Sequence, residues 1–134
     1  GIFEDQPAAA VEAVARAANL DIVQLYGGEN PTSARVWRAF RVQKGIDLAQ
    51  AAGAEAVLLD GPSNGFGFDW TQAKGIADKV IVAGGLNPDN VAEAVRVAQP
   101  WGVDVSSGVE TSPGIKDHDK IRRFIQAAQE AAQC

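Results

Sequence analysis

Three separate segments of the sequence place polar or glycine residues directly after an apolar run. Asp60 ends the run AVLLD, Gly84 and Gly85 follow VIVA, and a Ser-Ser-Gly loop at residues 106–108 follows Asp104. A partly shielded carboxyl group at a strand end can have a raised pKa and act as a general acid. Glycines let backbone N–H groups approach an anion closely. The three segments therefore suggest one site for a phosphate-bearing molecule.

The two glycine loops are the stronger signal for phosphate. Gly84 and Gly85 precede NPDN at residues 87–90, a typical helix start whose N-terminal dipole favours an anion. A glycine pair by itself more often only turns the chain. Two such loops after neighbouring strands favour a phosphate site formed by Gly84, Gly85, Ser107 and Gly108. The spacing is not GxGxxG, which argues against a dinucleotide site.

Both aspartates also have a structural explanation. Asp60 precedes a Gly-Pro pair and could bond to its own backbone in a turn, and chemistry alone does not separate this role from that of a general acid. Asp104 alternates with Val103 and Val105, so it points to the opposite face of its strand. In a barrel that face can be the interior, where a charge is costly without a partner or a function. A functional role is therefore favoured for Asp104.

The remaining reactive side chains indicate no other chemistry. His118 is the only histidine and lies in a charged helix start, where a solvated residue is favoured over a catalytic base. The only cysteine, Cys134, is the last residue, and without a second histidine or a cysteine cluster we expect no metal site. Arg38 and Arg41 could bind an acidic ligand, although surface ion pairs are favoured. The three tryptophans are expected to fill the core or its rim: Trp37, Trp70 and Trp101.

Composition limits the partners. The chain has 134 residues, 46% hydrophobic and 22% charged, with a formal net charge of −5. This acidic balance argues against nucleic-acid binding, which needs a basic face. No apolar run reaches the ~18–20 residues that span a membrane. A single cysteine is typical of a reducing cytoplasm. We expect one cytoplasmic domain over residues 1–134, with a small sugar phosphate or phosphate as its partner.

Apolar runs alternate with helical patterns along the whole chain. Such alternation predicts a parallel sheet covered by helices, with ligands at the carboxyl ends of the strands. The predicted strands lie at residues 1–3, 20–25, 36–42, 57–60, 80–83 and 103–105. The predicted helices begin near residues 7, 46, 69, 87 and 117. The ten residues between Leu25 and Val36 are too few for an ordinary helical crossover, which predicts a thin spot over the sheet.

Helical spacing predicts which side chains are buried. The first helix should bury Val11, Val14, Ala15 and Ala18. The helix after Gly85 should bury Val91, Ala94, Val95 and Ala98. The last helix should bury Ile121, Phe124, Ile125 and Ala128.

Several motifs together resemble a known family. They are GIFEDQP, DIVQLYGGE, VWRAFRV, VIVAGGLNPDNVAEA and GVDVSSGVETSPGIKD, in the same order and over nearly the whole chain. The sequence resembles phosphoribosylanthranilate isomerases of tryptophan biosynthesis, which are (βα)8 TIM barrels. The resemblance implies an Amadori rearrangement with Asp60 as general acid and Asp104 contacting the anthranilate amine. It places the phosphate on Gly84, Gly85, Ser107 and Gly108, and it implies no cofactor.

The sequence also departs from this family. The match begins at the third strand, so the first two βα units are absent. With them go the family's catalytic cysteine, which acts as general base, and a substrate-binding arginine. Cys134 does not match that cysteine. Tyr26 replaces a histidine in the family's QLHG motif, and the loop at residues 61–68 is short.

These departures predict an incomplete TIM barrel of about six parallel βα units. Its open edges should be the strands at residues 1–3 and 103–105. A repacked monomer is favoured over self-association through these edges. We expect little or no isomerase activity from this chain alone. The alternative is a catalytically inactive folded fragment that at most binds phosphate.

Overall fold

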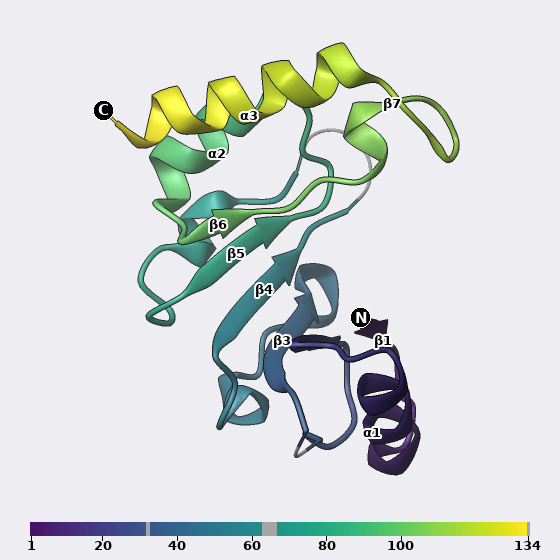
Figure 1. The fold of residues 1–134 in the computed structure, drawn as a ribbon. Helices are drawn as coiled ribbons and strands as arrows, with labels where there is room; N and C mark the ends of the chain where they lie inside the picture. Colours follow the sequence, from purple (N-terminus) through teal and green to yellow (C-terminus); the bar gives the residue numbers. More distant parts are fainter. Residues whose placement is uncertain (32, 63–66, 134) are drawn as a thin grey trace.

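The computed structural model describes residues 1–31, 33–62 and 67–133. Its centre is a six-stranded sheet in the order β1-β2-β3-β4-β5-β6, in which all neighbours are parallel (Figure 1). The strands are β1 (Ile2–Phe3), β2 (Ile22–Leu25), β3 (Arg35–Arg41), β4 (Ala56–Asp60), β5 (Val80–Ala83) and β6 (Gly102–Val103). The predicted fold class and both edge strands are confirmed. β6 ends before Asp104, earlier than predicted.

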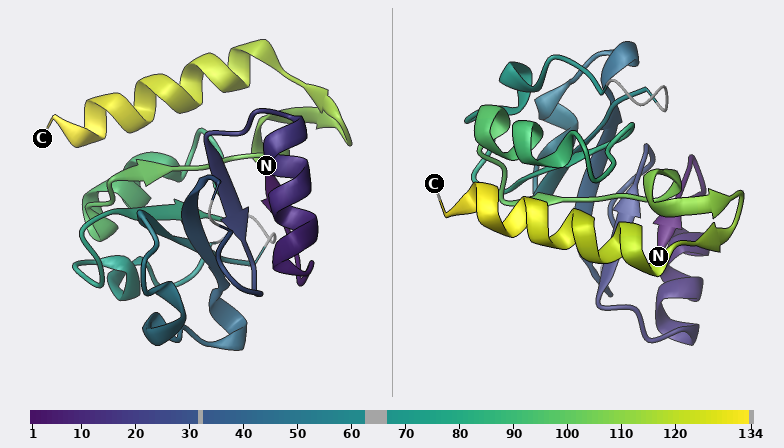
Figure 2. Two further views of the ribbon diagram at one scale, coloured as in Figure 1. Left: turned by 60° about the horizontal axis from the view of Figure 1, so that its bottom comes forward. Right: turned by 90° about the horizontal axis from the view of Figure 1, so that it is seen from above.

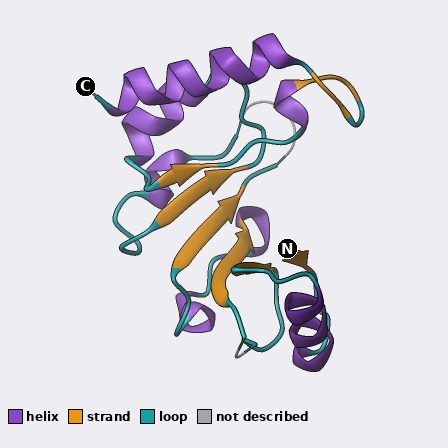
Figure 3. Cartoon of the chain, in the orientation of Figure 1, coloured by secondary structure: helices purple, strands orange, loops and turns teal. Residues whose placement is uncertain are grey.

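Helices cover the two ends of the sheet unequally, as Figures 1 and 3 show. The α-helices of the described residues are α1 (Ala8–Ala17), α2 (Val91–Ala98) and α3 (His118–Ala132). The single turns of 3-10 helix are η1 (Val42–Lys44), η2 (Leu48–Ala51), η3 (Trp70–Ala73) and η4 (Ser107–Val109). Within these residues no helix is both long and apolar enough to cross a membrane.

The helices predicted from residues 46 and 69 are longer than those observed, because only the single 3-10 turns η2 and η3 form there. Each turn begins with an aspartate, Asp47 or Asp69, whose carboxylate accepts a backbone N–H two residues later. Each is followed by a glycine with positive φ, Gly53 at 77° and Gly75 at 71°. A left-handed glycine ends a helix, so neither turn is extended. The predicted short loop at residues 61–68 falls largely outside the described residues.

The predicted thin spot between β2 and β3 is confirmed for the described residues, which form no helix there. Arg38 fills this position instead: it is only 4% exposed, and its guanidinium donates to the carbonyls of Gly27 and Gly28 and to the side-chain oxygen of Asn30. The expected surface ion pair is therefore wrong for Arg38. The side chain points to the helix-facing side of β3, where the loop passes over it.

The two faces of the sheet carry different layers. On the outer face, Leu59 and Val82 pack against α2 and Phe124 of α3. On the inner face, Leu58 and Ile81 lie in a smaller cluster with the partly buried Trp37. Trp37 meets Trp101 edge to face, with ring centroids 6.0 Å apart, so the two tryptophans close the lower end of this face. The predicted core or rim positions of the tryptophans are confirmed, since Trp70 is buried and Trp101 is half exposed.

The predicted buried face of α2 is confirmed except at Val95, which is only partly buried. For α1 and α3, the prediction included residues that are in fact exposed. Val14 of α1, Ala18 directly after α1, and Ile125 of α3 are exposed, contrary to expectation. α1 packs on β2 and β3 through Val11 and Ala15, which are the buried residues of this helix. α3 lies along α2 rather than across a strand (Figure 2), which leaves Ile125 without a covering element.

A short antiparallel hairpin after η4 was not predicted. It joins β7 (Glu110–Ser112) to β8 (Ile115–Lys116) through Gly114, whose φ is 81°. The Pro-Gly pair in ETSPGIK is the turn signal that indicates it. Lys116 donates to the carboxylate of Glu110 at 2.7 Å and to the carbonyl of Ser106 at 2.8 Å. The hairpin therefore braces the loop that follows β6.

Candidate functional site

The residues singled out in the sequence meet at the carboxyl ends of β4, β5 and β6. They line one cavity of about 250 Å³. Its wall contains Asp60, Asp104, Gly84, Gly85, Ser107 and Gly108, together with Ser106, Ala83, Leu86, Val105, Ile2, Gln24 and Tyr26. All six predicted site residues are thus brought together. Parallel strands place their carboxyl ends on one edge, which explains this convergence.

The glycines of the two loops allow the backbones to approach closely. A Cβ on Gly84, where φ is 80°, would lie 2.1 Å from the carbonyl oxygen of Gly61. A Cβ on Gly108 would lie 1.8 Å from the carbonyl oxygen of Leu86. No side chain fits at either place, so the loops after β4, β5 and β6 pack main chain against main chain. At these two points the wall of the cavity is formed by peptide groups.

Asn90 secures the loop after β5, a role that sequence reasoning missed. Its side-chain amide donates to the carbonyl of Gly85 at 3.0 Å, and its side-chain oxygen accepts the N–H of Asn87 at 2.8 Å. The Asn87 side chain in turn accepts the N–H of Asp89 at 2.8 Å. Residues 88–90 therefore form a turn, and α2 begins at Val91 rather than near residue 87 as predicted.

Asp60 ends β4 and is contacted from β2. The Tyr26 hydroxyl donates a hydrogen bond to Asp60 Oδ2 at 2.9 Å, and among the described residues it is the only donor to this carboxyl group. The turn that follows Asp60 lies partly outside the described residues, so the alternative in which Asp60 bonds to its own backbone stays a prediction. Burial and then the hydrogen bond and charge of Asp60 raise the pKa of Tyr26 to about 12, so the phenol keeps its proton and acts as a donor at neutral pH.

Asp104 presents a second carboxyl group to the same cavity. Its backbone N–H donates to the carbonyl of Val82 at 2.9 Å, which continues the pairing of β6 with β5 for one residue beyond the strand. Burial raises the pKa of Asp104, and the negative charge of Asp60 raises it further. Both effects favour the protonated form of Asp104. The cavity thus holds two carboxyl groups that repel each other when both are ionised.

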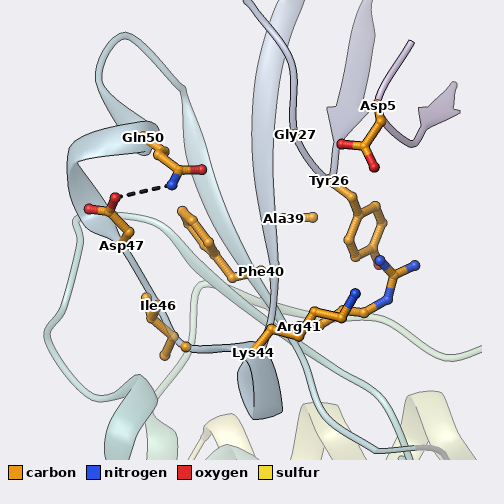
Figure 4. A pocket seen from close by; sticks show the side chains of 11 residues that line it. Asp5, Tyr26, Gly27, Ala39, Phe40, Arg41, Lys44, Ile46, Asp47 and Gln50 are labelled. Carbon is orange, nitrogen blue, oxygen red and sulfur yellow. Dashed lines mark hydrogen bonds between the residues drawn. The ribbon is translucent and has the colours of Figure 1, made fainter.

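A larger cavity of about 450 Å³ adjoins this site at Tyr26 (Figure 4). Arg41 and Lys44 line it from the end of β3, and both side chains extend towards Tyr26 in the figure. Arg41 pairs with Glu4, so the predicted surface ion pair is confirmed there. In the described part of the chain, His, Cys, Asp and Glu residues nowhere form a group of three or more that could hold a metal ion.

A parallel sheet with open edges and peptide-lined loops at its carboxyl end defines a partial TIM barrel. The chain belongs to the N-(5′phosphoribosyl)anthranilate (PRA) isomerase family, because the model of that family matches residues 1–127. The N-(5′-phosphoribosyl)anthranilate isomerase of Solibacter usitatus (strain Ellin6076) is 46% identical, over 98% of this chain and 72% of the relative. That of Thiobacillus denitrificans (strain ATCC 25259 / T1) is also 46% identical, over 96% and 71%.

Solved structures support the same family. TrpF from Jonesia denitrificans superposes with a TM-score of 0.81 at 37% identity, over 99% of this chain and 71% of that one. A phosphoribosyl anthranilate isomerase solved in complex with reduced 1-(o-carboxyphenylamino)-1-deoxyribulose 5-phosphate gives a TM-score of 0.78 at 34% identity, over 97% and 70%. Close to three tenths of each relative thus has no counterpart in this chain.

The Solibacter relative also has residues inside the matched region that this chain lacks. Its alignment spans 143 residues, whereas this chain has 134. The structure offers places for such differences, because the β2–β3 connection has no helix in its described part, and η2 and η3 are single turns. This chain therefore covers only part of the Solibacter relative, and within the matched region it is also shorter than that relative.

Proposed function

We propose that this chain binds the sugar phosphates of its family in the cavity at the ends of β4, β5 and β6. The observation that supports this is the convergence of Asp60, Asp104 and two glycine loops on one cavity. The peptide groups of Gly84, Gly85, Ser107 and Gly108 would hold the phosphate. Asp104 would contact the anthranilate amine. A solved relative in complex with a carboxyphenylamino-deoxyribulose phosphate has the matching ligand chemistry.

The reaction of this family would be the Amadori rearrangement of N-(5-phosphoribosyl)anthranilate. Asp60 would protonate the furanose ring oxygen, so that the C–O bond breaks and the amine nitrogen forms an iminium ion. A general base would then remove the proton from the second sugar carbon, giving an enolamine that becomes the ketone. General-base catalysis contributes roughly 10²–10⁴-fold to such a step. We infer that this base is lacking, and that the chain alone has little or no activity.

The base would belong to the first two βα units of the barrel, which we infer to be the part that this chain lacks. Within the described residues, β1 pairs with β2 alone and so leaves one side open. The two missing strands would lie between the open edges of β1 and β6. A folded fragment that only binds phosphate is the alternative, and it shares the same phosphate site.

The open edges also bear on association. We infer a repacked monomer, because Ile2 of β1 lines the same cavity as the loop after β6, and because Trp101 before β6 packs on Trp37. Both contacts cover part of the inner face. Light scattering after size exclusion at several concentrations tests this inference, and a stable dimer would contradict it. A cytoplasmic location, without nucleic-acid or membrane partners, is part of the same proposal.

The decisive test of activity is the fluorescence decay of freshly prepared phosphoribosylanthranilate. We expect the wild-type chain to match both the buffer blank and the Asp60→Asn variant. A rate above the blank that Asp60→Asn abolishes would show that the reaction survives, and would overturn the inference of a missing base. Binding is tested separately, with the reduced product analogue as the ligand. Absence of any binding would overturn the proposed site.

A further inference from the structure

Tyr26 lies where two cavities meet, and its hydroxyl is bound to the carboxyl group proposed as the acid. The ring follows β2, and the hydroxyl donates to Asp60 Oδ2 at 2.9 Å. Gln24, two residues earlier on the same strand, donates to the phenol oxygen at 3.4 Å. The phenol is thus both donor and acceptor, and among the described residues its hydroxyl donates only to Asp60.

The ring itself is held from the neighbouring strand. The guanidinium of Arg41, at the end of β3, lies 4.5 Å from the centroid of the Tyr26 ring, within the range of a cation–π contact. Arg41 is tied in turn to Glu4, which follows β1. Figure 4 shows Arg41 extended beneath the ring of Tyr26. A chain of contacts therefore runs from Glu4 through Arg41 and Tyr26 to Asp60, with one member from each of four neighbouring strand ends.

This geometry points to Tyr26 as a positioning residue for Asp60. The bond to Oδ2 fixes the rotation of the carboxyl group, and leaves the other oxygen without a donor from the described residues. That oxygen is the one available to a ligand in the 250 Å³ cavity. The inference rests on the proposed function, because it concerns the group that would protonate the substrate. It also gives the N-terminal strands a role in a site whose loops belong to the C-terminal ones.

The charged groups around Tyr26 affect its pKa in opposite directions. Asp60 faces the hydroxyl from β4 and disfavours the phenolate, whereas Arg41 faces the ring from β3 and favours it. Asp5 and Lys44 line the adjoining cavity with opposite charges. The net result, with burial as the largest cause, is a pKa of about 12. Removing the charge of Asp60 should therefore make Tyr26 ionise at lower pH.

The contact between Tyr26 and Asp60 can be tested by titration, because Tyr26 is the only tyrosine in the chain and its ionisation gives a single signal. Absorbance near 295 nm reports its ionisation, and far-UV circular dichroism reports whether the chain is still folded. We expect no more than about a tenth of Tyr26 to be ionised at pH 11 in the wild type. Asp60→Asn should shift the midpoint downwards. Asp104→Asn removes the other carboxylate of the cavity and should leave the midpoint nearly unchanged.

Ligand binding at neutral pH tests the functional consequence. Tyr26→Phe keeps the ring and its contact with Arg41 but removes the hydroxyl. We expect it to weaken binding of the reduced product analogue by about threefold to tenfold, the effect of one lost hydrogen bond, and to leave binding of inorganic phosphate unchanged. Tyr26→His, whose ring N–H can donate, should recover part of the loss.

The outcomes separate this inference from the proposed function. If the wild type binds the analogue and Tyr26→Phe binds it equally well, Tyr26 does not position Asp60. A wild-type midpoint near 10 in the folded state, or equal shifts in Asp60→Asn and Asp104→Asn, would also overturn the inference. If the wild type binds neither analogue nor phosphate, the proposed function fails instead, and the titration alone decides whether the Tyr26–Asp60 contact exists.

Discussion

The two halves of the sheet are stabilised in different ways. From β4 onwards, apolar strands lie under α2, α3 and η3, and the strand-end loops pack backbone against backbone around Gly84 and Gly108. From β1 to β3, the helix α1 packs on β2 and β3, and polar side chains complete the packing. Arg38 is buried under the β2–β3 loop, and Arg41 bridges Glu4 and Tyr26.

This difference explains how the two loops proposed to bind phosphate keep their shape in a partial barrel. Their shape depends on contacts within β4–β6 and α2, all of which are present. The N-terminal half contributes one hydrogen bond to the site, from Tyr26 to Asp60. Changes in the first half should therefore lower stability without removing phosphate binding, whereas changes in the second half should affect both. The predictions below test that division.

The largest effect is expected at Gly84 in the second half. Gly84→Ala would place a Cβ 2.1 Å from a backbone oxygen at a φ of 80°, which should lower the free energy of unfolding by about 3 kcal/mol or more. Gly75→Ala is the matched control, because φ is 71° there but nothing lies within 4 Å of the added carbon. Its loss should be about 1 kcal/mol, from backbone strain alone. Equal losses by urea denaturation would show that the close packing at Gly84 is not present.

Arg38 should give the largest loss in the first half. Arg38→Met keeps the apolar stem but leaves the carbonyls of Gly27 and Gly28 without their donor, and should destabilise by about 2 kcal/mol. Arg35→Met, on the same strand but with an exposed surface pair to Glu55, should change stability by about 0.5 kcal/mol or less. Phosphate binding should survive in both variants. Loss of phosphate binding in Arg38→Met would contradict the claim that the phosphate loops depend only on the C-terminal half.

A smaller and more local effect is expected at Asn90. Asn90→Asp keeps the oxygen that accepts from Asn87 but replaces the amide that donates to Gly85. We expect a loss of about 1 kcal/mol in stability, and weaker phosphate binding because the new charge repels the anion. Asp89→Asn, on the same turn but outside the cavity wall, serves as the control. Phosphate isotherms that coincide for Asn90→Asp and wild type would contradict this role.

The smallest effect concerns the pH dependence at Asp104, whose pKa is raised by burial and by Asp60. Between the ordinary aspartate value, about 3.9, and the raised value, the folded chain binds more protons than the unfolded chain, so stability contributed by this group falls as pH rises. Asp104→Asn should remove this decline and leave the chain slightly more stable than wild type at neutral pH. Urea unfolding at several pH values measures this dependence of stability on pH. If stability falls with pH in Asp104→Asn as it does in the wild type, the decline belongs to another group.

Much of this architecture could be predicted from sequence because its signals are local. The run VIVA followed by two glycines forms β5 and its loop at the predicted positions, and Asp60 closes β4 as expected. The grouping of the site residues followed from topology alone, since parallel strands share one carboxyl edge.

Other features depend on contacts between distant segments. Tyr26 and Asp60 are 34 residues apart, and their hydrogen bond depends on the register of β2, β3 and β4. The burial of Arg38 depends on the path of a loop without regular structure. The exposure of Ile125 depends on how α3 lies on α2, which helical periodicity does not specify.

The most direct test of the central claim is an amide NMR titration of the folded chain with inorganic phosphate, at constant ionic strength. We predict saturable shifts at the backbone amides of Gly84, Gly85 and Gly108, with one common midpoint. The amides of Gly27 and Gly28 in the first half should not move. An unchanged spectrum at the loops after β5 and β6, or equal shifts in both halves, would contradict the proposal that the C-terminal half holds a phosphate site.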